Sequence, residues 1–221
     1  IAVNSNHLDS KALSFDGSGD NVGFSSDVGP AGNAARTIML WAKTTSLADQ
    51  TLASYGDSTG TGTAFALGLN NWDSAGGGHG VTAHLGAAAI TFTPVTATND
   101  GQWHHYAVVV PSSASDGTVS LRDLELYQDG HRLTTVSALF NNDDRAVNTG
   151  SGNLNLGSWF NASIFFSGQM AEASVWSTAL TGGQISDYMT QSLSGGEAGL
   201  AGYWKLDEGA NATVIDSSNA S

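Results

Sequence analysis

Two tryptophans of this 221-residue chain stand in polar loops, where an exposed aromatic ring could bind a ligand. Trp72 lies in the glycine-rich segment 70–80, and Trp159 lies between Ser158 and Phe160. An exposed indole stacks on the face of a sugar ring while neighbouring amides bond the sugar hydroxyls. Either tryptophan could instead be an anchor that folds its loop back onto the domain. The candidate ligand-binding residues are Asn71, Trp72, Asp73, His79, Trp159 and Asn161.

A second candidate site is the segment Asp16-Gly-Ser-Gly-Asp-Asn21, which is typical of an oxygen-rich cation loop. Asp16, Asp20 and Asn21 place two carboxylates and an amide around flexible glycines. Calcium takes six to eight oxygen ligands, and these residues would supply several of them, although the segment is not an EF-hand. An ordinary glycine-rich hairpin explains the same residues. Calcium is therefore the cofactor that the sequence predicts, with this alternative open.

Catalytic chemistry has a weaker basis. Asp123, Glu125, Tyr127 and Asp129 alternate, and alternate side chains of a strand share one face. Glycoside hydrolases use a pair of carboxylates as acid and nucleophile, but a solvated strand face accounts for the same pattern. For zinc, three or four converging ligands are needed, and no histidine spacing here supplies them.

Composition narrows the class of protein. The chain has 20 acidic and 7 basic residues, a net charge of −13, and 16 of the acids are Asp. A field this negative repels phosphate, so nucleic acid is not an expected partner. Asp enrichment reflects either many turns or a calcium-rich extracellular setting. Without cysteine the disulfide-stapled class is excluded, and without an 18-residue apolar run no membrane insertion is expected. The start at Ile1 without a leader suggests a piece of a larger chain with other domains.

Short alternating segments separated by Gly, Asn, Asp and Ser predict an all-β fold of two stacked antiparallel sheets. One helix is expected over 181–193, where Thr181 and Gln184 form a capping box. Trp41, Trp103, Trp176 and Trp204 stand in apolar strands and are expected in or beside the core. The expected strands are 12–15, 21–24, 37–43, 50–55, 65–69, 81–85, 89–92, 104–110, 125–128, 133–136, 153–156, 168–175 and 201–206.

Several of these segments, in order, resemble the laminin-G-like (concanavalin A-like lectin/glucanase) superfamily, particularly its bacterial and pentraxin-related branch. The resemblance implies a jelly-roll sandwich over residues 1–196, and loops around 70–80 and after Gly157 that meet at one end. Residues 197–221 either close this sandwich, with 203–206 pairing with the first strand, or start a following repeat. The matching segments are 12–22, 37–43, 103–107, 154–157, 166–176 and 180–185.

Three functions stay open on this basis. The first is a non-catalytic carbohydrate-binding module of a larger secreted or surface-anchored bacterial protein, which recognises a glycan or cell-surface polysaccharide. The second is a structural or protein-binding spacer in an adhesin, with both loop tryptophans packed. The third is a glycoside hydrolase that uses Asp123 and Glu125.

Overall fold

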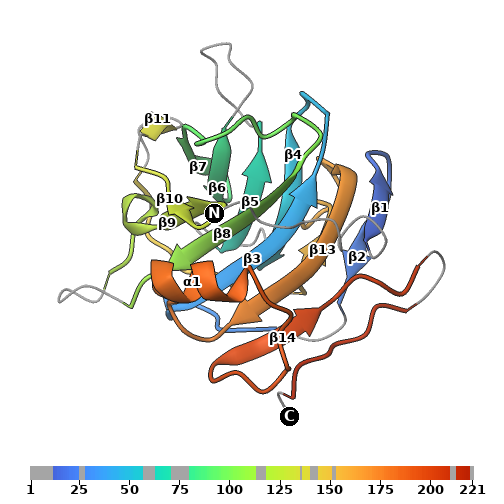
Figure 1. Ribbon diagram of the computed structural model, residues 1–221. Coiled ribbons are helices and arrows are strands. Elements are labelled where there is room, and N and C mark those ends of the chain that lie inside the picture. The colour runs from blue at the N-terminus through green and yellow to red at the C-terminus, as the bar shows by residue number, and fades with distance from the viewer. Residues whose placement is uncertain are drawn as a thin grey trace.

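Two antiparallel sheets lie face to face, and one short helix lies on the outside of one of them (Figure 1). The structure is a computed structural model, and it describes residues 12–24, 28–56, 63–70, 80–112, 118–134, 136–139, 144–150, 153–209 and 213–219. The two-sheet, all-β prediction is confirmed.

The sheet that carries the helix, here called the front sheet, is built around β13. This strand pairs with β3 on one side, while β1 and β14 share its other side end to end. β14 thus pairs with β13 rather than with the first strand, which corrects the expected partner. β1 already takes the N-terminal half of β13, so only its C-terminal half is open to the tail. In spatial order the front sheet comprises β1 (Leu13–Asp16) and β14 (Leu200–Trp204), then β13 (Ser167–Trp176), β3 (Arg36–Lys43), β8 (Trp103–Val110), β9 (Glu125–Gln128) and β10 (His131–Arg132).

The other sheet, here called the back sheet, also has seven strands among the described residues. In spatial order they are β11 (Val136–Leu139), β7 (Ala88–Phe92), β6 (Val81–Leu85), β5 (Ala64–Leu69), β4 (Gln50–Gly56), β12 (Asn155–Leu156) and β2 (Val22–Gly23).

One predicted strand, 133–136, is wrong. Asp129 and Gly130 both have positive φ, +52° and +76°, as a two-residue hairpin turn requires. The return strand β10 therefore starts directly after the turn, at His131, and ends before the predicted segment. A separate strand, β11, then begins at Val136 and joins the back sheet.

The core lies between the sheets, and the alternation of side chains fills it. On β3, Ile38 and Leu40 face inward, whereas Met39 and Trp41 face the outside of the front sheet. All four of these side chains are at most 3 % exposed. The front sheet is therefore buried on both faces.

The outer face of the front sheet is covered by α1 (Gly182–Tyr188) and the chain that follows it (Figure 1). The predicted capping box is present, since Thr181 Oγ1 accepts the N–H of Gln184. The helix ends earlier than predicted, because Thr190 donates its N–H to Asp187 in a tighter turn. In the described part of the chain, no helix has the length and apolar character needed to cross a membrane.

The predicted burial of four tryptophans is confirmed. Trp204 belongs to the core between the sheets, and Trp41, Trp103 and Trp176 lie on the covered outer face of the front sheet. The ring of Trp176 stacks on that of Tyr188, with centroids 4.6 Å apart.

Arg36 is a fully buried cation at the start of β3. Its guanidinium donates to the carbonyl oxygens of Ala34 (3.0 Å) and Gly32 (3.1 Å) and to the Thr149 hydroxyl (2.5 Å). It also lies 5.4 Å from the ring centroid of Tyr55. Arg36 thereby joins the loop before β3, the 144–150 segment and the back sheet.

We expect Arg36→Lys to lower the free energy of unfolding by about 3 kcal/mol, because a lysine cannot reproduce the planar fork and leaves buried carbonyls without donors. Urea denaturation measures this change. Arg122→Lys, at a side chain 51 % exposed, is the matched control and should change stability by no more than about 0.5 kcal/mol. Equal effects of the two substitutions would contradict the role given to Arg36.

Candidate functional site

The candidate ligand residues are only partly placed. Asn71, Trp72, Asp73 and His79 lie outside the described residues. The base of their loop is fixed, because the Asn70 N–H donates to the Gly80 carbonyl at 2.9 Å. Trp159 and Asn161 are described, and they carry the structural part of the site.

Trp159 lies on the outer face of the back sheet. Its half-buried ring meets the His84 ring edge-on, with centroids 5.1 Å apart, and adjoins Phe160 at the same distance. His84 is 5 % exposed, and burial lowers its pKa to about 4, so its ring is neutral at physiological pH. His84 lies on β6, four residues after Gly80. It therefore stands roughly 13 Å along the sheet from the base of the 71–79 loop.

The segment that carries Trp159 is tied closely to the sheet beneath it. Ser54 Oγ donates to the Ser158 carbonyl at 2.8 Å, and the Thr51 N–H donates to the Ile164 carbonyl at 3.3 Å. Ile164 has a φ of +50°, which is a strained conformation for a β-branched residue. Strain that the surrounding structure maintains is a reason to suspect function.

Asn161 is exposed at the tip of this segment. Its Oδ1 accepts the Ser163 hydroxyl at 2.5 Å, which orients the amide. The segment thus presents an exposed amide and, two residues earlier, a partly exposed aromatic ring.

The predicted cation segment forms a turn whose carboxylates cap its own backbone. Asp16 Oδ1 accepts the Ser18 N–H at 2.7 Å, and Asp20 Oδ2 accepts the Asp16 N–H at 2.9 Å. Both side chains and Asn21 are exposed. No third acidic or histidine side chain of the described residues joins them to make a metal-binding group. Each carboxylate retains one oxygen for an ion, so the turn offers part of a calcium shell at most.

The acids 123 and 125 do not share a strand face, which corrects that expectation. Asp123 lies in a short 3-10 helix, η2 (Leu121–Asp123), and its carboxylate accepts the N–H and hydroxyl of Ser120. Glu125, on β9, accepts the Tyr127 hydroxyl at 2.7 Å and pairs with Arg132 at 3.0 Å.

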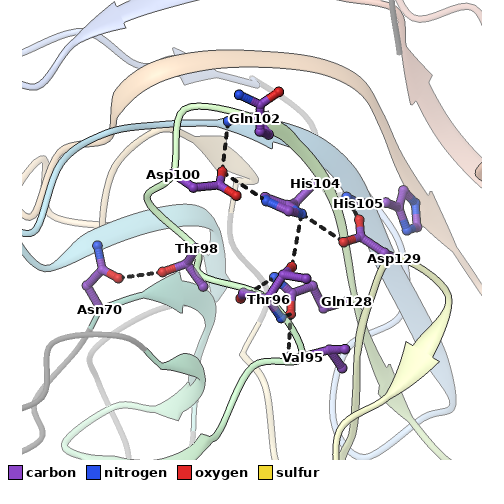
Figure 2. Close-up of polar contacts among 10 residues, drawn as sticks. All are labelled: Asn70, Val95, Thr96, Thr98, Asp100, Gln102, His104, His105, Gln128 and Asp129. Atoms are coloured by element: carbon purple, nitrogen blue, oxygen red, sulfur yellow. Dashed lines mark hydrogen bonds and ion pairs between the residues drawn. The ribbon is translucent and has the colours of Figure 1, made fainter. Parts of the chain in front are cut away.

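A polar cluster at one end of the front sheet was not singled out by the sequence. Figure 2 shows the ring of His104 between two carboxylates, with Nδ1 2.7 Å from Asp129 and Nε2 3.2 Å from Asp100. The second oxygen of Asp129 accepts the His105 N–H at 2.9 Å. The sequence signal that could have revealed this cluster was the Asp129-Gly130 turn. Pairing of β9 with β8 brings Asp129 next to the start of β8, where His104 lies.

The same cluster holds the chain that precedes β8 (Figure 2). Gln128 accepts the N–H groups of Val95 and Thr96, and Thr98 donates to Asn70 Oδ1 at 2.7 Å. Asn70 in turn donates to the Ser46 carbonyl at 2.8 Å. The cluster therefore fixes the position from which the loop with Trp72 departs.

Burial alone would lower the pKa of His104, but the hydrogen bonds and charges of Asp129 and Asp100 together outweigh it, so the pKa lies above its ordinary value of 6.5. A histidine whose pKa is raised by folding stabilises the folded state when it is protonated. This contribution is fully present below pH 6.5 and is lost as pH rises through the folded-state pKa. Burial lowers the pKa of His105 to about 4, so its contribution is lost as pH falls from 6.5 towards 4.

We therefore expect the free energy of unfolding to fall as pH rises above 6.5, and this decline to be smaller in His104→Gln. Denaturant titrations at several pH values between 6 and 9 measure it. His131→Gln, at an exposed position on β10, is the control. Superimposable pH profiles for the wild type and His104→Gln would exclude this role for the cluster.

Comparison with known proteins finds the same fold. Among solved structures, a candidate carbohydrate-binding protein from Bacteroides ovatus superimposes with a TM-score of 0.62 at 20 % identity, over 93 % of this chain. This chain spans only 55 % of that protein's length. A SAP-like pentraxin from Limulus polyphemus gives a TM-score of 0.55 at 18 % identity, over 81 % of this chain and 82 % of the pentraxin.

Domain 4 of AbnA, an extracellular arabinanase from Geobacillus stearothermophilus, solved with arabinotriose, gives a TM-score of 0.55 at 19 % identity, over 81 % of this chain and 76 % of that domain. At these identities the likeness shows the fold alone. No curated protein matches the sequence. The family model of the concanavalin A-like lectin/glucanases matches residues 16–186. The chain therefore belongs to the concanavalin A-like lectin/glucanase superfamily.

Proposed function

We propose that this chain is a non-catalytic, lectin-like carbohydrate-binding module of a larger secreted or surface-anchored bacterial protein. The observation that carries the proposal is the partly exposed Trp159, with the exposed, oriented amide of Asn161 on the same segment. The family, and relatives described as binding carbohydrate or solved with arabinotriose, support the same class of ligand.

The Trp159 segment suits stacking because it is held in place before a ligand arrives. His84 supports one edge of the indole, and the bonds from β4 to residues 158 and 164 restrict the backbone. Pre-organisation of this kind lowers the entropy lost on binding. A single shallow site of this type binds weakly, with a Kd on the order of 0.1–1 mM, and gains strength through multivalency.

The spacer function is the second candidate, because the contact between Trp159 and His84 is also what a loop anchor would make. For the hydrolase alternative, the arrangement of acids gives little support. Glycoside hydrolysis requires two carboxylates that flank one bond, and Asp123 and Glu125 are engaged in separate contacts on different elements.

We expect Trp159→Ala to weaken glycan binding about five- to tenfold, the size of one lost aromatic stacking contact. A glycan array identifies the ligand, and titration calorimetry then measures the change. Leu47→Ala, at a side chain 64 % exposed on another loop, is the matched control and should leave binding unchanged. If Trp159→Ala lowers the melting temperature and the wild type binds no glycan on the array, the spacer function is favoured instead.

Calcium dependence is a separate part of the proposal and rests on Asp16, Asp20 and Asn21. Calcium at about 100 times its Kd would add roughly 2.7 kcal/mol by mass action. That corresponds to a rise in melting temperature of roughly 5–10 °C for a domain of this size.

The rise should disappear in Asp20→Ala and persist in Asp123→Ala. Because Asp20→Ala also removes the bond to the Asp16 N–H, the informative quantity is the difference between scans with calcium and with chelator. Identical wild-type scans in the two conditions would leave the segment as a hairpin turn.

A further inference from the structure

A cavity of about 260 Å³ lies on the outer face of the front sheet, beneath the chain that follows α1. Its floor includes Trp41 and His105, its side includes Glu172 and Tyr203, and residues 189–192 form its outer wall. Since one liquid water occupies about 30 Å³, the cavity has room for a ring-sized molecule and is too small for most drug-sized ligands.

His105 gives this cavity an unmet hydrogen-bonding capacity. The side chain is 1 % exposed, and its Nδ1 has no hydrogen-bond partner. The neighbouring Trp41 contributes only a ring contact, with centroids 5.4 Å apart. Buried polar atoms almost always have partners, and one without a partner beside a cavity points to a ligand or water that supplies it.

Glu172 reaches the cavity through an irregularity in β13. Regular alternation after Ala171, which faces outward, would point residue 172 into the apolar core between the sheets. A bulge between Ala171 and Ser174 inserts one extra residue, and Glu172 adopts a φ of +54°. The carboxylate instead lies on the outer face, where it accepts the Tyr203 hydroxyl.

That placement is strained, because residues other than glycine rarely adopt such a φ. Bulges and strained residues of this kind concentrate at functional sites, where they redirect a side chain. Neither the bulge nor the carboxylate is needed to cover the sheet, since apolar residues do that elsewhere on the same face.

The lining favours a polyhydroxyl ligand over an amine. Glu172 and an imidazole nitrogen accept hydrogen bonds, whereas Gln191 and Ser192 both donate and accept. The Thr190 hydroxyl donates to the Asp187 carbonyl and can accept from a ligand. Sugar hydroxyls also donate and accept, and so match both kinds of group. An ammonium group only donates, so it could not accept a hydrogen bond from Gln191 or Ser192. The ring of Trp41, 3 % exposed, adds an apolar part to the lining.

We propose that this cavity is a second binding site, which takes a single uncharged sugar residue. The proposal rests on the proposed function for its class of ligand, a saccharide. It uses neither Trp159 nor Asn161, the two residues that are here called the Trp159 surface. Its contacts are Glu172 and His105 with the hydroxyls of the sugar, and Trp41 with its ring.

The test uses free monosaccharides as probes: glucose, galactose, arabinose and N-acetylglucosamine at up to 100 mM, with choline as the amine comparison. The protein is labelled with ¹⁵N-histidine, so that the ring nitrogens of His105 report directly on the cavity. We expect at least one sugar to shift the His105 signals with a saturable dependence on concentration.

Two substitutions at one position separate binding from folding. Glu172→Gln should reduce the affinity at least tenfold. Glu172→Gly should also abolish the His105 shift, while it folds readily, because glycine accepts the φ of this position without strain. Trp159→Ala should leave the monosaccharide response intact, and the Glu172 variants should retain glycan binding at the Trp159 surface.

Three results would overturn the proposal: no sugar shifts the His105 signals, only choline shifts them, or the sugar response survives unchanged in both Glu172 variants. Failure of glycan binding at the Trp159 surface, with a normal His105 response, would instead reject the proposed primary site alone.

Discussion

The front sheet buries side chains on both of its faces, and the arrangement of the rest of the molecule depends on this constraint. Residues 38 and 40 of β3 pack against the back sheet, while Met39 and Trp41 on the other face are equally buried. An apolar outer face needs a cover, and the chain after β13 provides it as α1 and the segment that follows the helix, residues 189–199. This cover leaves a cavity where it passes over His105 and Glu172, so the same constraint that stabilises the fold also creates a partly open, partly polar pocket.

Several backbone irregularities lie beside polar groups, although Leu206, with a φ of +60°, is buried in the apolar core. Among the described residues, the positive φ angles of Asn70, Asp129, Ile164 and Glu172 fall at the base of the 71–79 loop, in the histidine cluster, in the Trp159 segment and at the cavity. Regular strands satisfy their own backbone and have no reason to adopt such angles. Each of these four instead redirects a side chain or the chain itself towards a polar contact. Departures from local rules are expected where a protein places functional groups, so these four positions are the ones to test.

The sequence predicted the regular part of the fold well because that part depends on local patterns. Alternation located almost every strand, and Thr181 with Gln184 located the start of α1. The return strand after Asp129-Gly130 was misplaced because the two-residue turn, rather than the next apolar run, sets where pairing resumes. The contact of Trp159 with His84, and the bulge that turns Glu172 outward, depend on strands brought together from distant parts of the chain. No spacing within either segment encodes them, so the candidate sites were only partly predictable.

The two proposed binding surfaces lie on opposite sides of the sandwich. His84, beneath Trp159, points outward from the back sheet, and His105 points outward from the front sheet, so the whole core, about 10 Å between sheets, separates them. They share no residues, and at that distance their free energies of binding should add. A single polysaccharide chain would have to wrap around the sandwich to reach both. Two separate polysaccharide chains could each reach one of the sites without bending. If both proposed sites bind sugar, the module would favour cross-linking of neighbouring glycans, and weak individual contacts would gain strength from multivalency.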